Sequence, residues 1–451
     1  MAKKERVHYV CSNCQFDTEQ WQGKCPSCGQ WNTLEKIEPA VTSSSGKPKP
    51  TATALTSKRA SLFEASKYLD EKEQKRILFH SPLLNEFFSG GIAADSITLL
   101  AGEPGLGKST FALQLLKSTL QAQTLDALYI TAEESIEELA RRSIRLGVPN
   151  TLEILQTQRF ETIEAELNTR KPQLVILDSI QTVFSTAMDS APGSVSQVTN
   201  IATQLLSICK THRIALIIIG HVTKDGSIAG PRTLEHLVDT VLMMERTQQD
   251  LLTVSFVKYR FGSTEHIIFL KMAETGLSII QDPSLLLLEN LEDGVGITYS
   301  VVRIKNQNII VEIQALVAKN FSGTGFQRQG IGITNAKLNS LIAIIKKYLH
   351  FDLDGSDIYV TLLGLPRGIW DESLDLTIIL AILSSFTNKT IQDLMGMNGK
   401  SRPVFAGRVT LSGTIRNATA NPTRAKTAEK LKLDYNPTIQ AGELKNLQLR
   451  L

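Results

Sequence analysis

The sequence lacks an apolar run long enough to cross a membrane. No apolar stretch reaches the roughly 20 residues that a bilayer-spanning helix needs. Residues 1–6 lead into a polar, cysteine-rich segment that has no apolar centre of the kind found in signal peptides. We therefore expect a cytoplasmic protein without a membrane partner.

A large excess of charge of one sign is also absent. The 48 basic and 45 acidic residues leave a formal net charge of only +3. Any binding of nucleic acid must therefore come from local basic patches, because the global charge does not supply it. A chain of 451 residues is long enough for two or three domains, each with its own core.

Cysteine is scarce, and its placement predicts a metal site. Four of the five cysteines form two C-x-x-C pairs separated by ten residues, namely Cys11, Cys14, Cys25 and Cys28. Four thiolates at this spacing can close around one tetrahedral Zn²⁺. A redox C-x-x-C is the alternative, but a redox pair needs no second copy and no β-α-β pattern surrounds this segment. We predict a zinc ribbon over residues 1–36, with Trp21 and Trp31 covering the metal.

Residues 37–74 are rich in Pro, Ser, Thr, Lys and Ala. This composition predicts a flexible linker, interrupted by a short helix at 61–68.

A stretch of nine residues after the linker fits a phosphate-binding loop. An apolar strand at 96–101 precedes it and an amphipathic helix at 109–121 follows, which is the context that the G-x-x-x-x-G-K-S pattern requires. A glycine-rich turn that matches by chance is the alternative, and this context disfavours it. The loop is expected to bind ATP through Gly102, Glu103, Pro104, Gly105, Leu106, Gly107, Lys108, Ser109 and Thr110.

Each type of residue in the loop has a physical role. Glycines let the backbone point its amides at phosphate oxygens, and the start of the helix adds a partial positive charge. Lys108 is expected to reach the β- and γ-phosphates, and the hydroxyl of Ser109 to ligate Mg²⁺.

Two acids follow the next predicted strand, at 127–131. Carboxylates at the carboxyl end of a strand beside the phosphate loop can orient an attacking water. We expect Glu133 to do so and take Glu134 as the next candidate. The alternative makes one of them an acid in the first turn of a helix at 135–147, where the helix dipole favours negative charge.

Two further strands end on polar residues. The strand at 173–178 closes on Asp178, which fits the Walker B role of holding Mg²⁺ through its hydration shell. The strand at 214–219 leads to His221, which either senses the γ-phosphate or caps the strand.

Two polar segments, 185–197 and 223–232, lack the apolar periodicity of buried elements. Loops of this kind at the rim of an ATPase can grip a nucleic-acid backbone, here through Lys224 and Arg232. Ordinary surface loops are the alternative.

Taken together, the motifs resemble the RadA (Sms) family of bacterial DNA-repair proteins over nearly the whole chain. The four-cysteine ribbon and the phosphate loop contribute, and so do the segments A-E-E-S, I-L-D-S-I-Q, P-G-S-V-S-Q, H-V-T-K-D-G, A-G-P-R-T-L-E-H-L-V-D and K-Y-R-F-G. The resemblance implies an α/β protein whose RecA-like ATPase domain spans residues 75–283. It also implies a homo-hexameric ring that moves on single-stranded and branched DNA and works with RecA recombinase in branch migration.

The family's K-N-R-F-G motif corresponds to Lys258-Tyr259-Arg260-Phe261-Gly262, with Tyr259 in place of the usual Asn. By resemblance, Lys258 and Arg260 act across a subunit boundary, either on the neighbour's nucleotide or in coupling hydrolysis to DNA. A cation supplied in this way would stabilise the charge that develops on the transferred phosphoryl group.

Residues 284–451 are similar to the family's Lon-protease-like α/β domain. Ser373 falls near the position of the Lon nucleophile, but the position of its lysine holds Arg424, which stays protonated and cannot act as a base. We therefore expect a scaffold domain. The family's basic DNA-binding loop survives only in part here, around Arg328 and Lys337.

Three functions follow as hypotheses. An ATP-driven DNA motor accounts for all the motifs together. A nucleotide-switched adaptor that binds DNA or RecA without moving is the alternative, and an ATP-dependent peptidase is disfavoured by the missing lysine.

Overall fold

The computed structural model describes residues 8–11, 17–18, 21–26, 29–31, 33–37, 76–221, 233–247, 251–284, 293–320, 325–365, 370–397, 402–417, 421–431, 433–435, 442–447 and 449. They belong to two compact units, residues 1–69 and 70–451, which are described separately. Except for Ile37, the predicted linker lies outside the described residues, and so does its predicted helix.

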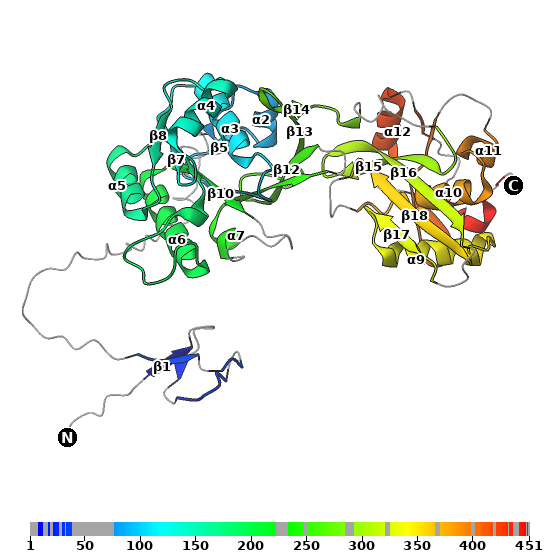
Figure 1. The fold of residues 1–451 in the computed structure, drawn as a ribbon, viewed down its shortest axis with the longest axis horizontal. Coiled ribbons are helices and arrows are strands. Elements are labelled where there is room, and N and C mark those ends of the chain that lie inside the picture. Colours follow the sequence, from blue (N-terminus) through cyan, green and yellow to red (C-terminus); the bar gives the residue numbers. More distant parts are fainter. Residues whose placement is uncertain are drawn as a thin grey trace, which may run out of the picture. The chain divides into compact units, whose positions relative to one another are not determined.

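The first unit contains a small antiparallel sheet in the strand order β2-β1-β3. Figure 1 labels its central strand, β1. Its strands are β1 (His8–Cys11), β2 (Asp17–Thr18) and β3 (Leu34–Ile37). An isolated bridge joins Lys24 to Trp31.

The N-terminal part of the second unit, which holds the predicted ATPase domain, is built on a nine-stranded sheet in the order β14-β13-β12-β11-β6-β10-β9-β7-β8. The strands from β11 to β8 in this order are parallel, and β12, β13 and β14 add antiparallel neighbours. A separate pair joins β4 (Arg76–Ile77) to β5 (Ile92–Ala93). The strand bounds of the large sheet are β6 (Ile97–Gly102), β7 (Ala127–Thr131), β8 (Glu153–Gln156), β9 (Leu174–Asp178), β10 (Ala215–His221), β11 (Thr240–Arg246), β12 (Leu252–Tyr259), β13 (Ile267–Ala273) and β14 (Gly276–Ile280).

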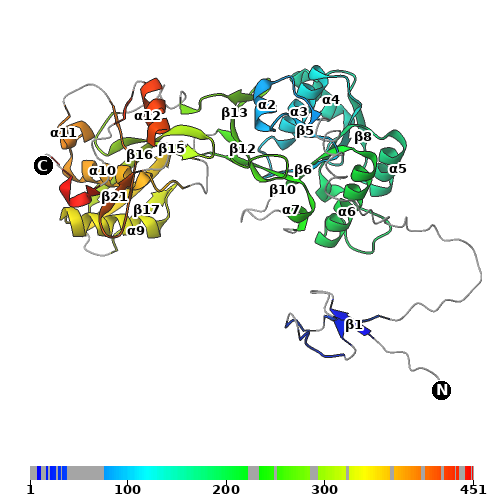
Figure 2. The same cartoon turned by 180° about the vertical axis from the view of Figure 1, so that it is seen from behind.

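Helices cover both faces of this sheet (Figures 1 and 2). One face packs into a core with α2 (Pro82–Phe87), α3 (Lys108–Ala122) and α4 (Ile136–Leu146). The other packs with α5 (Phe160–Arg170), α6 (Val195–His212) and α7 (Thr233–Leu237). Because both faces are covered, β6, β7 and β9 are buried along their whole length, which explains their unbroken apolar sequences.

The predicted strands and helices of the ATPase domain are confirmed, with shifts of a few residues. The helix predicted over 135–147 is α4, with Ser135 and Gly147 as its two caps. The polar segment 185–197 is shorter than predicted, because α6 already begins at Val195. Gln197 is buried inside that helix and donates to the carbonyl of Ser190 at 2.8 Å, so it belongs to the core side of the segment. The second segment, 223–232, lies outside the described residues.

The C-terminal part contains a six-stranded sheet in the order β17-β18-β16-β15-β19-β22 and a three-stranded sheet in the order β20-β21-β23. Helix α10 packs on the larger sheet within a single apolar core. The bounds are β15 (Ile297–Ile304), β16 (Gln307–Lys319), β17 (Arg328–Ile331), α9 (Asn335–Ile344), β18 (Ser356–Leu363), α10 (Leu374–Thr387), α11 (Ile391–Met395), β19 (Pro403–Val404), β20 (Gly407–Val409), β21 (Thr414–Asn417), α12 (Asn421–Lys430), β22 (Asp434–Tyr435) and β23 (Gly442–Glu443).

The turn between β15 and β16 joins the two parts of this unit. The ammonium of Lys305 donates to the carbonyls of Phe256, at 2.6 Å, and Thr264, at 2.8 Å. The amide of Asn306 donates to the carbonyl of Glu265 at 2.8 Å. The C-terminal core also includes Phe269 of β13, so apolar packing continues across the junction. Within the described residues, no helix has the length and apolar character needed to span a membrane.

Candidate active site

Four neighbouring parallel strands end at one edge of the nine-stranded sheet and bring the predicted reactive groups together. In the order β6-β10-β9-β7, the strand ends lead to Lys108, His221, Asp178 and Glu133. The register places Gly102 beside His221 and Asp178 beside Thr131. The carboxyl edge of a doubly wound sheet is where such folds bind their ligands.

The backbone after β6 has the features that a phosphate group requires. Gly105 and Gly107 have φ of +80° and +89°, a region that side chains with a Cβ rarely adopt, and the space where a Cβ of Gly105 would lie is open. Helix α3 then starts with no acidic residue in its first turn and no side chain bonded at its cap. Its first amides are therefore available to an anion, so the loop fits a nucleotide phosphate.

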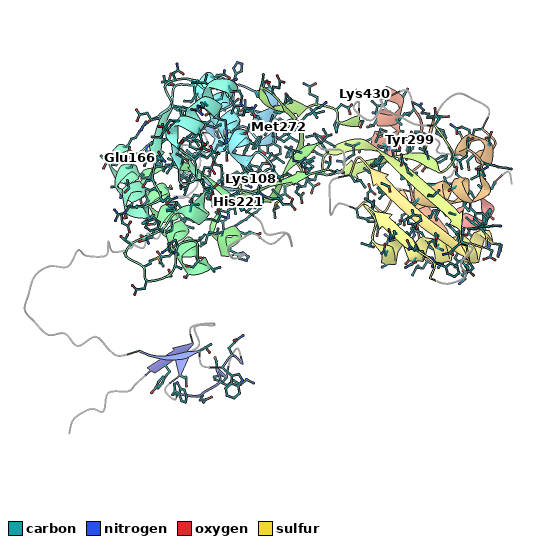
Figure 3. All side chains as sticks on the ribbon, viewed as in Figure 1. Lys108, Glu166, His221, Met272, Tyr299 and Lys430 are labelled. Carbon is teal, nitrogen blue, oxygen red and sulfur yellow. The ribbon has the colours of Figure 1, made fainter. Side chains whose placement is uncertain are left out.

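Lys108 bonds to its own loop. Its ammonium donates to the carbonyls of Gly102, at 2.9 Å, and Glu103, at 2.8 Å, and lies 3.1 Å from Nδ1 of His221 (Figure 3). Burial lowers the pKa of Lys108, and the charges of Asp178 and Glu133 oppose that shift. These three contacts match the three hydrogens of an ammonium group.

His221 links Lys108 to Glu133. An ammonium can only donate, so Nδ1 of His221 accepts and the proton of a neutral ring is on Nε2, which lies 3.4 Å from Oε1 of Glu133. The hydroxyl of Ser179 donates to the same carboxylate oxygen. The bond with His221 is the main cause that lowers the pKa of Glu133, which burial opposes. His221 thus bridges two charged groups, and its two suggested roles, sensing the γ-phosphate or capping the strand, stay predictions.

Asp178 is buried, and its carboxylate is held by a residue that the sequence analysis missed. The hydroxyl of Tyr129 donates to Oδ2 of Asp178 at 2.7 Å. Burial, reinforced by Asp178, raises the pKa of Tyr129 well above its ordinary value. The strand register offered a signal, because Tyr129 lies two residues before Thr131, the partner of Asp178. Ser109, in the first turn of α3, and Asp178 are the oxygen donors that could hold Mg²⁺.

Glu134 is engaged elsewhere, in an ion pair with Arg142 at 2.6 Å. The acids in the first turn of α4 are Glu137 and Glu138, so the interpretation of Glu133 or Glu134 as a first-turn acid is wrong. Of the two candidates, only Glu133 contacts the group around Lys108.

Arg260 lies at the opposite edge of the sheet. Its guanidinium donates to Oδ1 of Asp239 at 2.9 Å, and Oδ2 of Asp239 accepts from the amide of Ile97 at 3.2 Å. Ile97 begins β6 and Gly102 ends it, so about five strand residues, or roughly 17 Å, separate this site from the phosphate loop. The structure therefore does not bring Arg260 to the phosphate loop of its own chain.

The other residues of the K-Y-R-F-G motif also face away from that loop. The ammonium of Lys258 is bonded to carbonyls at the end of α7. Tyr259 stacks on Phe256 with ring centroids 4.2 Å apart, and its hydroxyl donates to the carbonyl of Phe88. The residue that replaces the usual Asn thus packs against the start of the ATPase domain.

The candidate DNA contacts are only partly visible. Lys224 and Arg232 lie outside the described residues. Arg328, in β17, donates to Oδ1 of Asn339 at 3.3 Å. Lys337, in α9, forms an ion pair of 2.8 Å with the fully buried Asp375. The position of Lys337 is therefore fixed by the core of its own domain.

Ser373 and Arg424 do come together, in a sealed site. Arg424 is 2% exposed, and its guanidinium donates to the hydroxyl of Ser373 and to the carbonyl of Val301, the latter at 2.8 Å. The second terminal nitrogen of Arg424, Nη2, donates to Oδ2 of Asp371 at 2.7 Å. A guanidinium that donates to the serine hydroxyl cannot accept its proton.

The cysteine site is described in part. Cys25 is buried, and its carbonyl accepts from the amide of Gly29 at 2.9 Å, with Gly29 at φ +71°. This hydrogen bond fits a thiolate knuckle. Cys11 ends β1, whereas Cys14 and Cys28 lie outside the described residues, and the residues that are described contain no cluster of three or more metal-ligating side chains. Trp21 and Trp31, expected to cover the metal, are 59% and 69% exposed.

The parallel sheet, the phosphate loop and the carboxylates at its edge define a RecA-like P-loop ATPase. Residues 63–227 match the family model of an AAA domain, and residues 9–36 match that of a rubredoxin metal binding domain. DNA repair protein RadA of Bacillus subtilis is 34% identical over 435 residues, covering 95% of this chain and 91% of the relative. The proteins of the same name in Aquifex aeolicus and Helicobacter pylori are also 34% identical, covering 95% of this chain and 92% of each relative.

Among solved structures, a KaiC-like protein of Pyrococcus horikoshii is similar at 17% identity and a TM-score of 0.39, covering 46% of this chain and 99% of that protein. The extent and identity of the sequence matches show that the chain belongs to the RadA family of DNA-repair proteins. Its AAA domain implies the use of nucleotide and Mg²⁺ and supports ATP hydrolysis, and its ribbon supports Zn²⁺.

Proposed function

We propose that this protein is an ATP-driven motor on single-stranded and branched DNA that promotes branch migration of recombination intermediates with RecA recombinase. The observation that carries the proposal is the contact of Lys108 and Glu133 through His221 at the edge where the phosphate loop lies. A pure binding module has no need of a carboxylate linked to its phosphate loop in this way.

We propose a role in ATP hydrolysis for each group, which its contacts support. Lys108 would exchange its loop carbonyls for phosphate oxygens. Glu133, ionised because its pKa is held low, would accept a hydrogen bond from the attacking water and orient it. Ser109 and Asp178 would hold Mg²⁺, which when bound supplies positive charge next to the phosphates.

Arg260 is proposed to act on the nucleotide of a neighbouring subunit. It cannot reach its own phosphate loop, and its side chain is 54% exposed. A second copy placed with its phosphate loop against this edge would receive a cation only when the ring is closed. A homo-hexamer, as the resemblance implies, would repeat this contact at every interface.

A nucleotide-switched adaptor is the second candidate function. One observation favours it: the ammonium of Lys108 is bonded to its own loop and to His221. ATP must displace these partners before Lys108 can bind it, so the loop could close on ATP and hydrolyse it slowly. The sealed contact between Arg424 and Ser373 argues against a peptidase.

The two candidates differ in movement, so the test is a branch-migration assay on a three-strand DNA intermediate. The motor should move the branch with ATP, should stop with a non-hydrolysable analogue, and should fail in Lys108→Ala. DNA binding that depends on nucleotide but leaves the branch in place under all three conditions would contradict the motor and support the adaptor.

A further inference from the structure

Ser179 is buried, and its hydroxyl contacts the carboxylate of Glu133. It follows Asp178, the last residue of β9, and is 0% exposed. Its hydroxyl donates to Oε1 of Glu133. Because water does not reach Ser179, no solvent molecule competes for this hydroxyl, and the bond holds Oε1 in one direction.

The turn that begins at Ser179 does not use this hydroxyl. Ser179 stands directly before the short helical turn η1 (Ile180–Thr182), at the position where a serine side chain usually accepts a hydrogen bond from a helix amide. Its side chain forms no such bond. The carbonyl of Ser179 accepts from the hydroxyl of Thr182 at 2.9 Å, so a different side chain fixes this turn. The hydroxyl of Ser179 is therefore available to Glu133.

The backbone on both sides of Glu133 is fixed by other bonds. The amide of Ala132 donates to the carbonyl of Asp178 at 2.7 Å. The hydroxyl of Thr131 donates to the carbonyl of Glu134 at 2.8 Å and accepts from the amide of Glu134 at 3.1 Å. The direction of the carboxylate therefore depends on the side chain of Glu133 and on the groups that contact it.

The two oxygens of that carboxylate have different surroundings. Oε1 accepts from Ser179 and lies 3.4 Å from Nε2 of His221. The bond with His221 is the largest cause that lowers the pKa of Glu133, and the bond with Ser179 lowers it as well. Among the described residues, none forms a hydrogen bond with Oε2, and the side chain of Glu133 is 35% exposed. Oε2 can therefore accept a hydrogen bond from water.

Of the two donors to Oε1, Ser179 is the one that does not depend on the nucleotide. His221 is bonded to Lys108, whose ammonium would leave its present partners for phosphate oxygens. Ser179 is held by the end of β9 and by the turn η1. Its bond to Glu133 can therefore persist when Lys108 changes partners.

We propose that Ser179 is a positioning residue for ATP hydrolysis: its hydroxyl holds Oε1 of Glu133 and thereby directs Oε2 to the attacking water. This inference rests on the proposed function of Glu133 in orienting that water. A hydroxyl suits this role because it donates to a carboxylate and carries no charge that would pair with the phosphates.

The first test is Ser179→Ala in the full chain, with ATP hydrolysis measured without DNA. Alanine removes one oxygen, and Oε1 of Glu133 keeps its contact with His221, so no buried acceptor loses its last partner. The kcat should fall about tenfold, because a misdirected carboxylate orients the water less well, while the KM for ATP stays close to that of the wild type.

Ser96→Ala is the matched control. Ser96 is 2% exposed, and its hydroxyl donates to the carbonyl of Ala93 at 2.6 Å. This variant also loses a buried hydroxyl, but it should keep the kcat of the wild type. An unchanged kcat in Ser179→Ala, or an equal loss in Ser96→Ala, would overturn the proposal.

A double substitution separates positioning from a general structural effect. Glu133→Ala removes the carboxylate, so Ser179 has nothing left to direct. Adding Ser179→Ala should then lower the remaining turnover by less than about twofold, whereas an independent effect of Ser179 would lower it by about tenfold again and overturn the proposal. Wild-type turnover in Glu133→Ala would contradict the role of Glu133 itself. Because no DNA is present, a failure of the proposed DNA motor would leave these results unchanged.

Discussion

The phosphate-loop edge of the large sheet and the Ser373 site of the C-terminal domain each hold a buried cation among several hydrogen-bond partners. Lys108 bonds to carbonyls of a loop that includes the exposed Glu103 and to His221, whose side chain is 29% exposed. Arg424 bonds to Val301, Ser373 and Asp371 inside a core, with Ser373 only 2% exposed. The difference teaches that the surroundings of the partners decide the role: Lys108 can exchange partners with a ligand, and Arg424 cannot.

The strongest test of this contrast is Glu133→Gln. The amide keeps the size of the side chain but cannot act as a carboxylate toward water, so ATP hydrolysis should fall about 10²-fold or more while ATP binding remains. Turnover with saturating ATP and equilibrium binding of a fluorescent nucleotide measure the two properties. Glu134→Gln, which loses only the pair with Arg142, should retain most of the turnover. Comparable losses in both variants would mean that the carboxylate nearest Lys108 has no special role.

Substitution of Arg424 in the buried site with Ser373 should lower the stability of the protein and leave ATP hydrolysis unchanged. Arg424→Met leaves the carboxylate of Asp371 and the carbonyl of Val301 without their donors, which should lower the free energy of unfolding by about 3 kcal/mol. Urea denaturation measures the loss. Arg408→Met removes a cation from an ion pair whose two side chains are each 51% exposed, and should cost below about 1 kcal/mol. Equal costs would contradict the structural role of Arg424.

Tyr129→Phe should have a smaller effect, at the metal. Loss of the hydroxyl that orients Asp178 should raise the Mg²⁺ concentration needed for half-maximal hydrolysis by about tenfold, as for other residues that hold a metal ligand in place. Tyr359→Phe, which loses an exposed bond to Gln327, is the matched control. An unchanged Mg²⁺ requirement would mean that Asp178 does not hold the metal, or that the hydroxyl of Tyr129 does not help it to do so.

The smallest expected effect is a dependence of stability on pH. The pKa of Glu133 is lower in the folded protein than its ordinary value of 4.5, so the ionised group stabilises the fold above that value. This contribution is lost as the pH falls through the lowered pKa. The difference in unfolding free energy between the wild type and Glu133→Gln should therefore shrink between about pH 6 and pH 3. A difference that grows toward acid pH would mean that the shift has the opposite sign.

Much of the ATPase fold could be predicted from the sequence, because its signals are local. Apolar runs such as that of β7 and the caps Ser135 and Gly147 belong to single segments of chain, and each segment formed the element expected. The start of α6 was missed because a buried Gln197 looks like part of a polar loop until its bond to Ser190 is known.

The contacts within the sites could not be predicted in the same way, because they join residues far apart in the chain. Ser373 and Arg424 were identified separately, but their bond depends on how α10 and α12 pack. The motif lysine, Lys258, was expected to act beside Arg260, yet spacing in the sequence carries no information on which carbonyls lie near its ammonium. Tyr129 lies in an apolar strand, so its sequence context predicts only a core residue. The pairing of that strand with β9 brings its hydroxyl to Asp178.

The most direct test of the account is steady-state ATP hydrolysis by the full chain, with and without single-stranded DNA, at two salt concentrations. A motor that grips phosphates should hydrolyse ATP faster with DNA, and the stimulation should weaken at the higher salt concentration as counterions compete. ATP that is bound tightly but hydrolysed at the same rate with and without DNA would contradict the proposed DNA-driven ATPase.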